Sequence, residues 1–299
     1  MTPHARAGIL RRLWSLGTGR FGLIVVAVVV ITAAVSLVWT PFPPLQTDIG
    51  AAWLPPSWPH LLGTDALGHD ILSMIMAGAR TTVIVAVGAG LIATVIGMAL
   101  AVLGALTARW LRESVAVFVD ILIAFPVLII AMMIAAVWGG SLWVVVWAVG
   151  IGFGVSIARV ARPELRRVLH ADFVIAGRAS GLTNAQNLRR HLMPNVLPVF
   201  IVQLSWGMAV AVLAEAGLSY LGLGAPVTQP SWGQLLQQLQ QYLAVHPLSA
   251  VWPGLAIMFT VLGLNLLGDA LREATDPTLS VRRRGSARRA RTHQPEVVS

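Results

Sequence analysis

Six long apolar runs dominate this sequence and decide what it can fold into. They cover residues 21–39, 81–106, 115–137, 142–157, 196–218 and 249–271. Most of them approach the length of about 20 residues that an α-helix needs to cross a bilayer. A transmembrane β-barrel would alternate apolar and polar residues, whereas residues 23–30 are continuously apolar. With 57% hydrophobic residues, the chain is predicted to be an all-α membrane protein, a bundle of six transmembrane helices.

The distribution of arginine predicts the orientation of these spans. All 21 basic residues are arginines, and no lysine occurs. If the N-terminus is cytoplasmic, twenty of the 21 arginines fall on the cytoplasmic side and Arg80 alone falls outside. Cytoplasmic loops of membrane proteins carry an excess of positive residues. We therefore predict a multi-pass protein of the cytoplasmic (inner) membrane with both termini in the cytoplasm.

Hydropathy divides the chain into five segments. We expect a cytoplasmic N-terminus at residues 1–20, an uncleaved first transmembrane helix at 21–39 and an extracytoplasmic segment at 40–80, in which six prolines cluster. The core, residues 81–271, holds the other five spans and a cytoplasmic loop at 159–195. Residues 272–299 form an arginine-rich cytoplasmic tail that we expect to be disordered. A short amphipathic helix is expected near Gln234, ahead of the last span.

Two absent residue types exclude several chemistries. Without lysine there is no P-loop, so the chain is not expected to be an ATPase or to form Schiff bases. Without cysteine there are no thiolate nucleophiles, disulfides or thiolate-bound metals. The seven histidines follow no metal-binding pattern, and no GxSxG motif occurs. We expect no catalytic, metal or cofactor site, and we expect the arginine-rich tail to attract membrane lipid rather than nucleic acid.

A polar stretch separates two of the spans. It covers residues 172–198, DFVIAGRASGLTNAQNLRRHLMPNVLP. Small residues between Ala176 and Gly181 leave the backbone open to close approach. Farther on, Leu188 and Leu192 recur four residues apart, which is helical spacing. No set of catalytic residues accompanies them, so the stretch is interpreted as a surface on which another protein docks.

Three acidic residues in or beside the apolar runs are candidate functional groups, because a charge inside a membrane is energetically costly. Glu215 lies in the fifth run and could line a translocation path or gate; structural hydrogen bonding is the alternative. Asp120 and Asp269 lie near the cytoplasmic ends of their runs, where pairing with a neighbouring arginine is the simpler explanation. Asp120 is kept with Glu215 as a candidate for the path.

The polar stretch resembles the EAA loop of the permeases of ATP-binding-cassette importers, which carries a Glu-Ala-Ala triplet, a later glycine and a hydrophobic-proline pair. Ala176 occupies the middle of the triplet, Gly181 the glycine position and Met193-Pro194 the late pair. Two positions depart from the pattern, because Ile175 replaces the glutamate and Gly177 replaces the last alanine.

Three further stretches resemble the C-type permease subunit of the dipeptide, oligopeptide and nickel group of that family. Residues 63–70, GTDALGHD, are similar to its GTDxxGRD signature, with His69 in place of arginine. Residues 214–224, AEAGLSYLGLG, and 230–233, PSWG, are similar to its AEAxLSFLGLG and PSWG motifs. Residues 265–277, NLLGDALREATDP, are similar to its NLLGDxLRDxLDP ending.

The resemblance implies a six-helix subunit of a binding-protein-dependent importer, without an ATPase site of its own. Its partners would be a homologous permease in a heterodimer, two ATP-binding-cassette ATPases that hold ATP and Mg²⁺, and an extracytoplasmic substrate-binding protein. The substrate would be dipeptides or oligopeptides, and nickel or another small solute is the alternative within the family. A self-contained secondary transporter is the alternative outside it, although neither an inverted repeat nor mid-membrane coupling acids stand out.

The same resemblance assigns residues to two roles. A coupling helix in the 159–195 loop would contact one ATPase through Asp172, Phe173, Ala176, Gly177, Arg178, Gly181, Leu182 and Pro194. Structural positions of the family signature would be Gly63, Asp65, Gly68, Asp70, Gly222, Gly224, Trp232, Gly233, Asp269 and Asp276. ATP binding would close the ATPases, and the coupling helix would move with them and open the pathway toward the other side.

Overall fold

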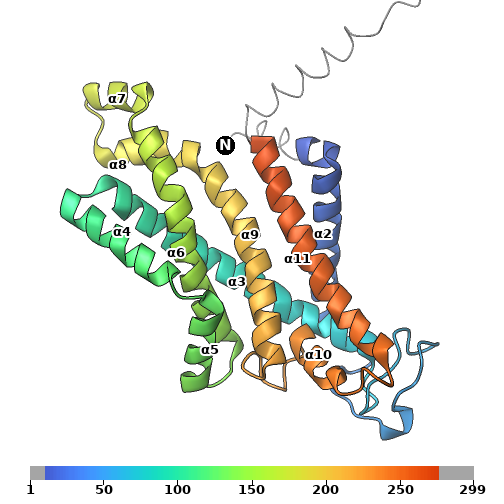
Figure 1. Ribbon diagram of the computed structural model, residues 1–299. Helices are drawn as coiled ribbons and strands as arrows, with labels where there is room; N and C mark the ends of the chain where they lie inside the picture. Colours follow the sequence, from blue (N-terminus) through green and yellow to red (C-terminus); the bar gives the residue numbers. More distant parts are fainter. Residues whose placement is uncertain (1–10, 276–299) are drawn as a thin grey trace, which may run out of the picture.

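The computed structural model describes residues 11–275, except for the side chains of Leu106, Arg178, Asn184 and Ala185. Within that range every regular element is a helix, and an isolated β-bridge joins Thr64 to Asp70. The helices form an elongated bundle with α7 at one end and α10 at the other (Figure 1). The predicted fold class is confirmed. Asp276 and the rest of the arginine-rich tail beyond it lie outside the described residues.

Five helices are long and apolar enough to cross a membrane. They are α2 (Gly17–Ser36), α3 (Ile71–Leu106), α6 (Leu142–Leu169), α9 (Met193–Tyr220) and α11 (Pro247–Thr275). The bent pair formed by α4 (Arg109–Ile123) and α5 (Val127–Trp138) supplies a sixth crossing if it is counted as one span. α3 packs along α6 and α9, while α11 packs against α9 and α2. α10 (Trp232–Gln240) covers the end of the bundle opposite α7 (Figure 1).

The third span is not the continuous helix predicted for residues 115–137. α4 and α5 meet at an angle of 79°, and residues 124–126 break the helix between them. Pro126 has no backbone N–H to donate, and its ring disfavours the helical conformation at Phe125. Hydropathy alone does not reveal this break, because both halves are apolar.

The helix that carries the second apolar run begins at Ile71, ten residues before that run starts at Thr81. The glycine-flanked turn at residues 63–68 predicts a helix that begins near Asp70, and this prediction is confirmed. Asp70 caps the helix, because its carboxylate accepts a hydrogen bond from the backbone N–H of Ser73 at 2.8 Å. The first turns of α3 are buried, as Met74 and Ala77 show. Helix α3 therefore takes up the last ten residues of the segment predicted to be extracytoplasmic, residues 40–80.

Glycines allow α3 and α6 to approach each other closely. A Cβ atom placed on Gly97 would lie 2.6 Å from Cβ of Ile157, and one on Gly150 would lie 2.8 Å from Cβ of Ile92. Small residues bring helices together in membranes, where burial of apolar surface against lipid drives little association. α3 and α6 therefore form the closely packed centre of the bundle.

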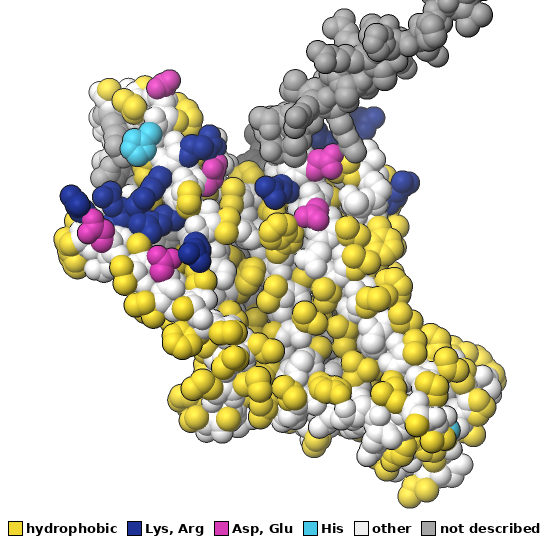
Figure 2. Space-filling model, viewed as in Figure 1, with side chains coloured by type: hydrophobic (Ala, Val, Ile, Leu, Met, Phe, Trp, Pro, Cys, Tyr) yellow, Lys and Arg dark blue, Asp and Glu magenta, His cyan; other side chains and the backbone are white. Residues whose placement is uncertain are grey.

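Charge is distributed unevenly between the two ends of the bundle. On the face shown in Figure 2, arginine side chains gather at the end that carries α7, and none is visible at the α10 end. Arg80, predicted to lie on the opposite side from the other arginines, donates from Nε to the hydroxyl of Ser36 at 2.7 Å. The bundle thus has one arginine-rich end, called the α7 end below, and one arginine-poor end, the α10 end.

Candidate functional site

The polar stretch predicted as a docking surface begins with a short helix at the edge of the molecule. α7 (Asp172–Ala179) follows α6 and lies beyond the long helices (Figure 1). Val174 is fully buried in a cluster that includes Leu192, whereas Phe173 and Ile175 are 45% and 53% exposed. One face of α7 is therefore anchored in the bundle, and the other presents apolar and small side chains to its surroundings.

The other residues predicted for a coupling helix lie on or near α7. Asp172 is exposed in the first turn, and Ala176 is exposed one turn later. Leu182 is half-buried after the helix, and Pro194 is exposed in the first turn of α9. The side chain of Arg178 lies outside the described residues. Most of the residues predicted for the coupling helix thus lie on α7 or in the segment that directly follows it.

Gly181 turns the chain after α7. Its φ of +82° lies in the left-handed region, which glycine adopts without steric cost, and nothing lies within 4 Å of a Cβ placed there. The next helix, α8 (Asn184–Asn187), begins with a capping box. In this box, Thr183 N donates to Gln186 Oε1 at 2.8 Å, and Gln186 N donates to Thr183 Oγ1 at 3.2 Å. The turn is therefore set by backbone conformation and local hydrogen bonds.

The structure explains one of the two departures from the family pattern. A Cβ placed on Gly177 would lie 2.6 Å from Oδ1 of Asn187, so an alanine would collide with that amide unless it moved. Asn187 is buried, and its amide nitrogen and oxygen have no hydrogen-bond partner in the described part of the chain. Gly177 therefore gives room to the Asn187 side chain. Ile175, the other departure, adds apolar surface to the exposed face of α7.

A direct connection links this region to the long helix α9. The π-helical turn η2 (Leu188–Leu192) runs into α9, which starts at Met193. Leu192 and Val196 are buried in the cluster that holds Val174 of α7. The three side chains share one packed cluster. If α7 moves, the start of α9 therefore either holds it in place or moves with it.

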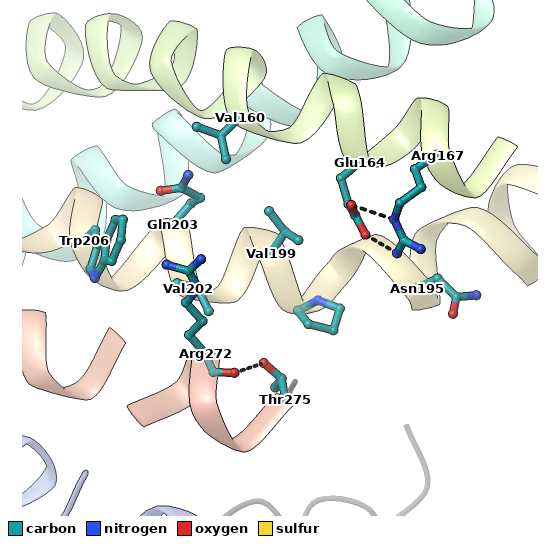
Figure 3. Close-up of a pocket in the computed structure, with 11 residues that line it drawn as sticks. Val160, Glu164, Arg167, Asn195, Val199, Val202, Gln203, Trp206, Arg272 and Thr275 are labelled. Carbon is teal, nitrogen blue, oxygen red and sulfur yellow. Dashed lines mark hydrogen bonds and ion pairs between the residues drawn. The ribbon is translucent and has the colours of Figure 1, made fainter. Parts of the chain in front are cut away.

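A cavity of about 480 Å³ opens between α6, α9 and α11 toward the α7 end. Figure 3 shows Gln203 and Trp206 on α9 at one side, and the Glu164–Arg167 ion pair of α6 at the other. Arg272 of α11 also lines it. These residues were not singled out in the sequence, because three helices far apart in the chain build the cavity. The sequence offered one indication of this cavity, namely Gln203, a polar residue within an apolar run.

The acidic candidates of the sequence have local partners. Glu215 is 1% exposed on α9 and accepts a hydrogen bond from the hydroxyl of Ser219 at 2.7 Å, which favours the structural alternative. Asp120 lies 3.4 Å from Arg159, and both side chains are more than half exposed. Asp269 is exposed near the end of α11 and forms no ion pair with a described residue. The structure does not bring these three carboxylates together.

The first family-signature stretch forms a hydrogen-bonded turn at the α10 end. Asp65 accepts hydrogen bonds from the backbone N–H groups of Leu67 and His69, at 2.9 and 2.8 Å, and its second oxygen lies 2.7 Å from the His69 ring. Asp70 caps α3 as described. Gly63 and Gly68 both have φ of +78°, so these positions set the turn that delivers the chain into α3.

The remaining signature residues pack α10 against the rest of the bundle. Trp232 donates from Nε1 to the carbonyl of Ile75 at 2.9 Å. A Cβ placed on Gly233 would clash with the carbonyl oxygen of Ala216, and one on Gly224 would clash with Ser219. Gly222 has φ of +76° where the chain leaves α9. Close backbone approach therefore accounts for the glycines of these motifs.

The apolar bundle, its arginine-rich end and its exposed helix between two spans define a multi-pass membrane protein. The family of binding-protein-dependent transport system inner membrane components matches residues 93–281, and the chain belongs to this family. It is 33% identical over 258 residues to the dipeptide transport system permease protein DppC of Alkalihalophilus pseudofirmus, covering 86% of this chain and 85% of that protein. It is 32% identical over 259 residues to a peptide permease protein of Brucella suis, covering 86% of each.

These comparisons confirm the resemblance stated from the sequence motifs. The chain is an inner-membrane permease subunit of an ATP-binding-cassette importer. Its family works with ATPases and a binding protein.

Proposed function

We propose that this subunit imports dipeptides or oligopeptides, and that ATP hydrolysis by two partner ATPases drives the transport through α7. The observation that carries the proposal is the construction of α7, which has a buried anchor, Val174, beneath an exposed apolar face at Phe173 and Ile175. A helix held on one side and open on the other suits insertion into a groove of a partner. The arginine-rich α7 end would face the cytoplasm, where the ATPases are.

The proposed mechanism is alternating access. Closure of the ATPases on ATP would move α7, and the shared cluster of Val174, Leu192 and Val196 would carry that motion into α9. ATP and Mg²⁺ would be held by the ATPases, and this chain would hold no cofactor. A homologous permease would complete the pathway as a heterodimer, and an extracytoplasmic binding protein would deliver the solute at the α10 end.

The cavity in Figure 3 supports a peptide as the solute. Its lining combines a glutamine amide, an indole and charged groups of both signs, from Gln203, Trp206, Arg272 and the Glu164–Arg167 pair. A peptide carries amide donors and acceptors together with terminal charges, and such groups are recognised by a few polar side chains in an otherwise apolar site. The relatives named above as peptide and dipeptide permeases point to the same solute class.

The test is uptake of a labelled tripeptide by proteoliposomes that contain this chain with its partner permease, the two ATPases and the binding protein. Replacing Phe173 and Ile175 together by alanine removes the exposed face of α7 and spares the anchor. We expect ATP-driven uptake to fall at least about tenfold, which corresponds to about 1.4 kcal/mol, because truncation of an important interface residue costs more than about 1 kcal/mol. Val28→Ala, at a similarly exposed position on α2, is the matched control and should transport normally.

Two results would contradict the proposal. Unchanged uptake by the double alanine variant would show that α7 does not transmit the motion. ATP hydrolysis by this chain reconstituted alone would show that the energy source is not a separate subunit.

A further inference from the structure

A second cavity, of about 490 Å³, lies between α3, α4 and α6 near the α7 end. It is separate from the cavity of Figure 3, because Arg159, Arg162 and Arg166 of α6 line this one, whereas Glu164 and Arg167 line the other. The two cavities therefore flank α6. The proposed function uses only the first of them.

The second cavity carries an excess of positive charge. Arg159 is balanced by Asp120 at 3.4 Å. Arg162 and Arg166 lie one turn apart, and the charges of Arg162 and the nearby Arg112 act on Arg166. None of these last three forms an ion pair with a residue that the structure describes. Figure 2 shows the corresponding gathering of arginine side chains over α4 and α6. Like charges held together in this way attract an anion.

Arg162 has an unused hydrogen-bond donor. Its Nε atom is buried and has no acceptor within residues 11–275, while one terminal nitrogen reaches the carbonyl oxygen of Arg112 at 3.5 Å. The side chain passes over Gly104 of α3, where a Cβ would lie 3.3 Å from its Cδ. Buried polar groups are nearly always paired, so an unpaired guanidinium nitrogen beside a cavity indicates an acceptor that residues 11–275 do not supply.

Much of the remaining lining of the cavity is apolar. It includes Leu100 of α3, Val115 and Val119 of α4 and Ala158 of α6. Trp110, in the first turn of α4, is 71% exposed, and tryptophan at such positions marks the level of lipid headgroups. A site with a cationic rim and an apolar wall fits a molecule with an anionic head and a hydrocarbon tail better than it fits free phosphate.

We propose that this cavity binds an anionic phospholipid, with the headgroup phosphate held by Arg162 and Arg166 and supported by Arg112. The guanidinium fork matches the geometry of phosphate oxygens and can donate two hydrogen bonds to them. An acyl chain lies along the apolar wall formed by α3 and α4.

The experiment measures lipid binding to the full chain purified in detergent, by native mass spectrometry. Dioleoyl-phosphatidylglycerol, dioleoyl-phosphatidylcholine and inorganic phosphate are titrated separately and in competition. For the double variant R162Q/R166Q, we expect phosphatidylglycerol to bind about 25-fold more weakly, about fivefold for each arginine removed. R162K should show an intermediate loss, because lysine keeps the charge but not the fork. R109Q is the matched control, because Arg109 is exposed and already paired with Glu113.

Several outcomes would overturn the proposal. Equal phosphatidylglycerol binding by the wild type and the folded double variant would exclude these arginines, with folding checked by size-exclusion chromatography. Equal binding of phosphatidylcholine would exclude recognition of negative charge, and displacement of the lipid by inorganic phosphate would make this a free-anion site. If the double variant binds lipid normally but no longer co-purifies with the partner permease, the arginines contact a protein instead.

Discussion

The turn at residues 63–70, at the α10 end, and the α7 region at the other end differ in how completely their buried polar groups are paired. At the α10 end, Thr64, Asp65 and Asp70 are almost fully buried, and each has at least two hydrogen bonds. At the α7 end, the buried amide of Asn187 has no partner among the described residues, and Gly181 borders open space. Regions with few satisfied contacts open more readily than fully bonded ones. The contrast indicates that the turn at residues 63–70 is a rigid platform and that the α7 region moves more readily.

The largest effect is expected at Gly68, on the rigid side of the comparison. A Cβ placed there would clash with the carbonyl oxygen of Asp48, and φ is +78°. Gly68→Ala should therefore destabilise the protein by more than about 3 kcal/mol, because backbone collision and strain add. Thermal unfolding followed by size-exclusion chromatography measures the loss. A variant as stable as the wild type would show that this turn is not rigid.

The second prediction concerns Gly181, whose φ is similar but whose surroundings are open. Gly181→Val should cost about 2 kcal/mol, from a β-branched residue in the left-handed region without any collision. The altered turn should lower ATP-driven peptide uptake about tenfold while the protein still inserts into the membrane. Gly181→Asn is the control, since asparagine tolerates positive φ and should keep most of the uptake. Normal uptake by the valine variant would contradict a coupling role for this turn.

A smaller effect is expected when the cap of α3 is removed. Asp70→Ala loses the hydrogen bonds to Ser73 and the contact with His60 at 3.0 Å. Loss of a helix cap costs about 1 kcal/mol, so the unfolding temperature should fall by a few degrees. Asp70→Asn keeps an acceptor for Ser73 N and should lose less. Equal stability of the alanine variant would mean that the cap is not needed for the platform.

The smallest effect, opposite in sign, is expected at Asn187. Asn187→Leu replaces an unpaired buried amide with an apolar side chain of similar size, so stability should stay the same or rise by up to about 1 kcal/mol. We expect the same replacement to reduce uptake if freedom at the α7 end serves transport. A marked loss of stability would show that the amide has a partner in the protein.

The sequence predicted the long helices more accurately than their ends and breaks. Hydropathy located the span that forms α9, and its polar neighbour was correctly interpreted as a separate exposed stretch. Pro126 was available as a signal for the broken third span, but apolar residues on both sides concealed its effect. The start of α3 could be predicted from the turn residues Gly63, Asp65 and Gly68, which indicate a helix beginning near Asp70, although the apolar run itself begins only at Thr81.

The candidate sites could be predicted from the sequence only in part, because they depend on contacts between residues that are far apart in the chain. The family motifs pointed to the residues of α7 and to the turn at Gly181. They did not explain why position 177 is a glycine, because the side chain that needs the space belongs to Asn187, ten positions later in the chain. Likewise, the partner of Glu215 is Ser219, one turn away on the same helix, and this pairing could have been anticipated from helical spacing. The two cavities could not, because each requires the packing of three helices.

The length of α3 has a mechanical consequence. Its 36 residues, at a rise of about 1.5 Å each, make an unbroken rod about 54 Å long, well beyond the hydrocarbon thickness of about 30 Å. One rigid body therefore reaches from the Asp70 turn at the α10 end to the wall of the arginine-lined cavity at Leu100. A displacement of one end of α3 is therefore expected to reach the other end as a tilt of the whole helix.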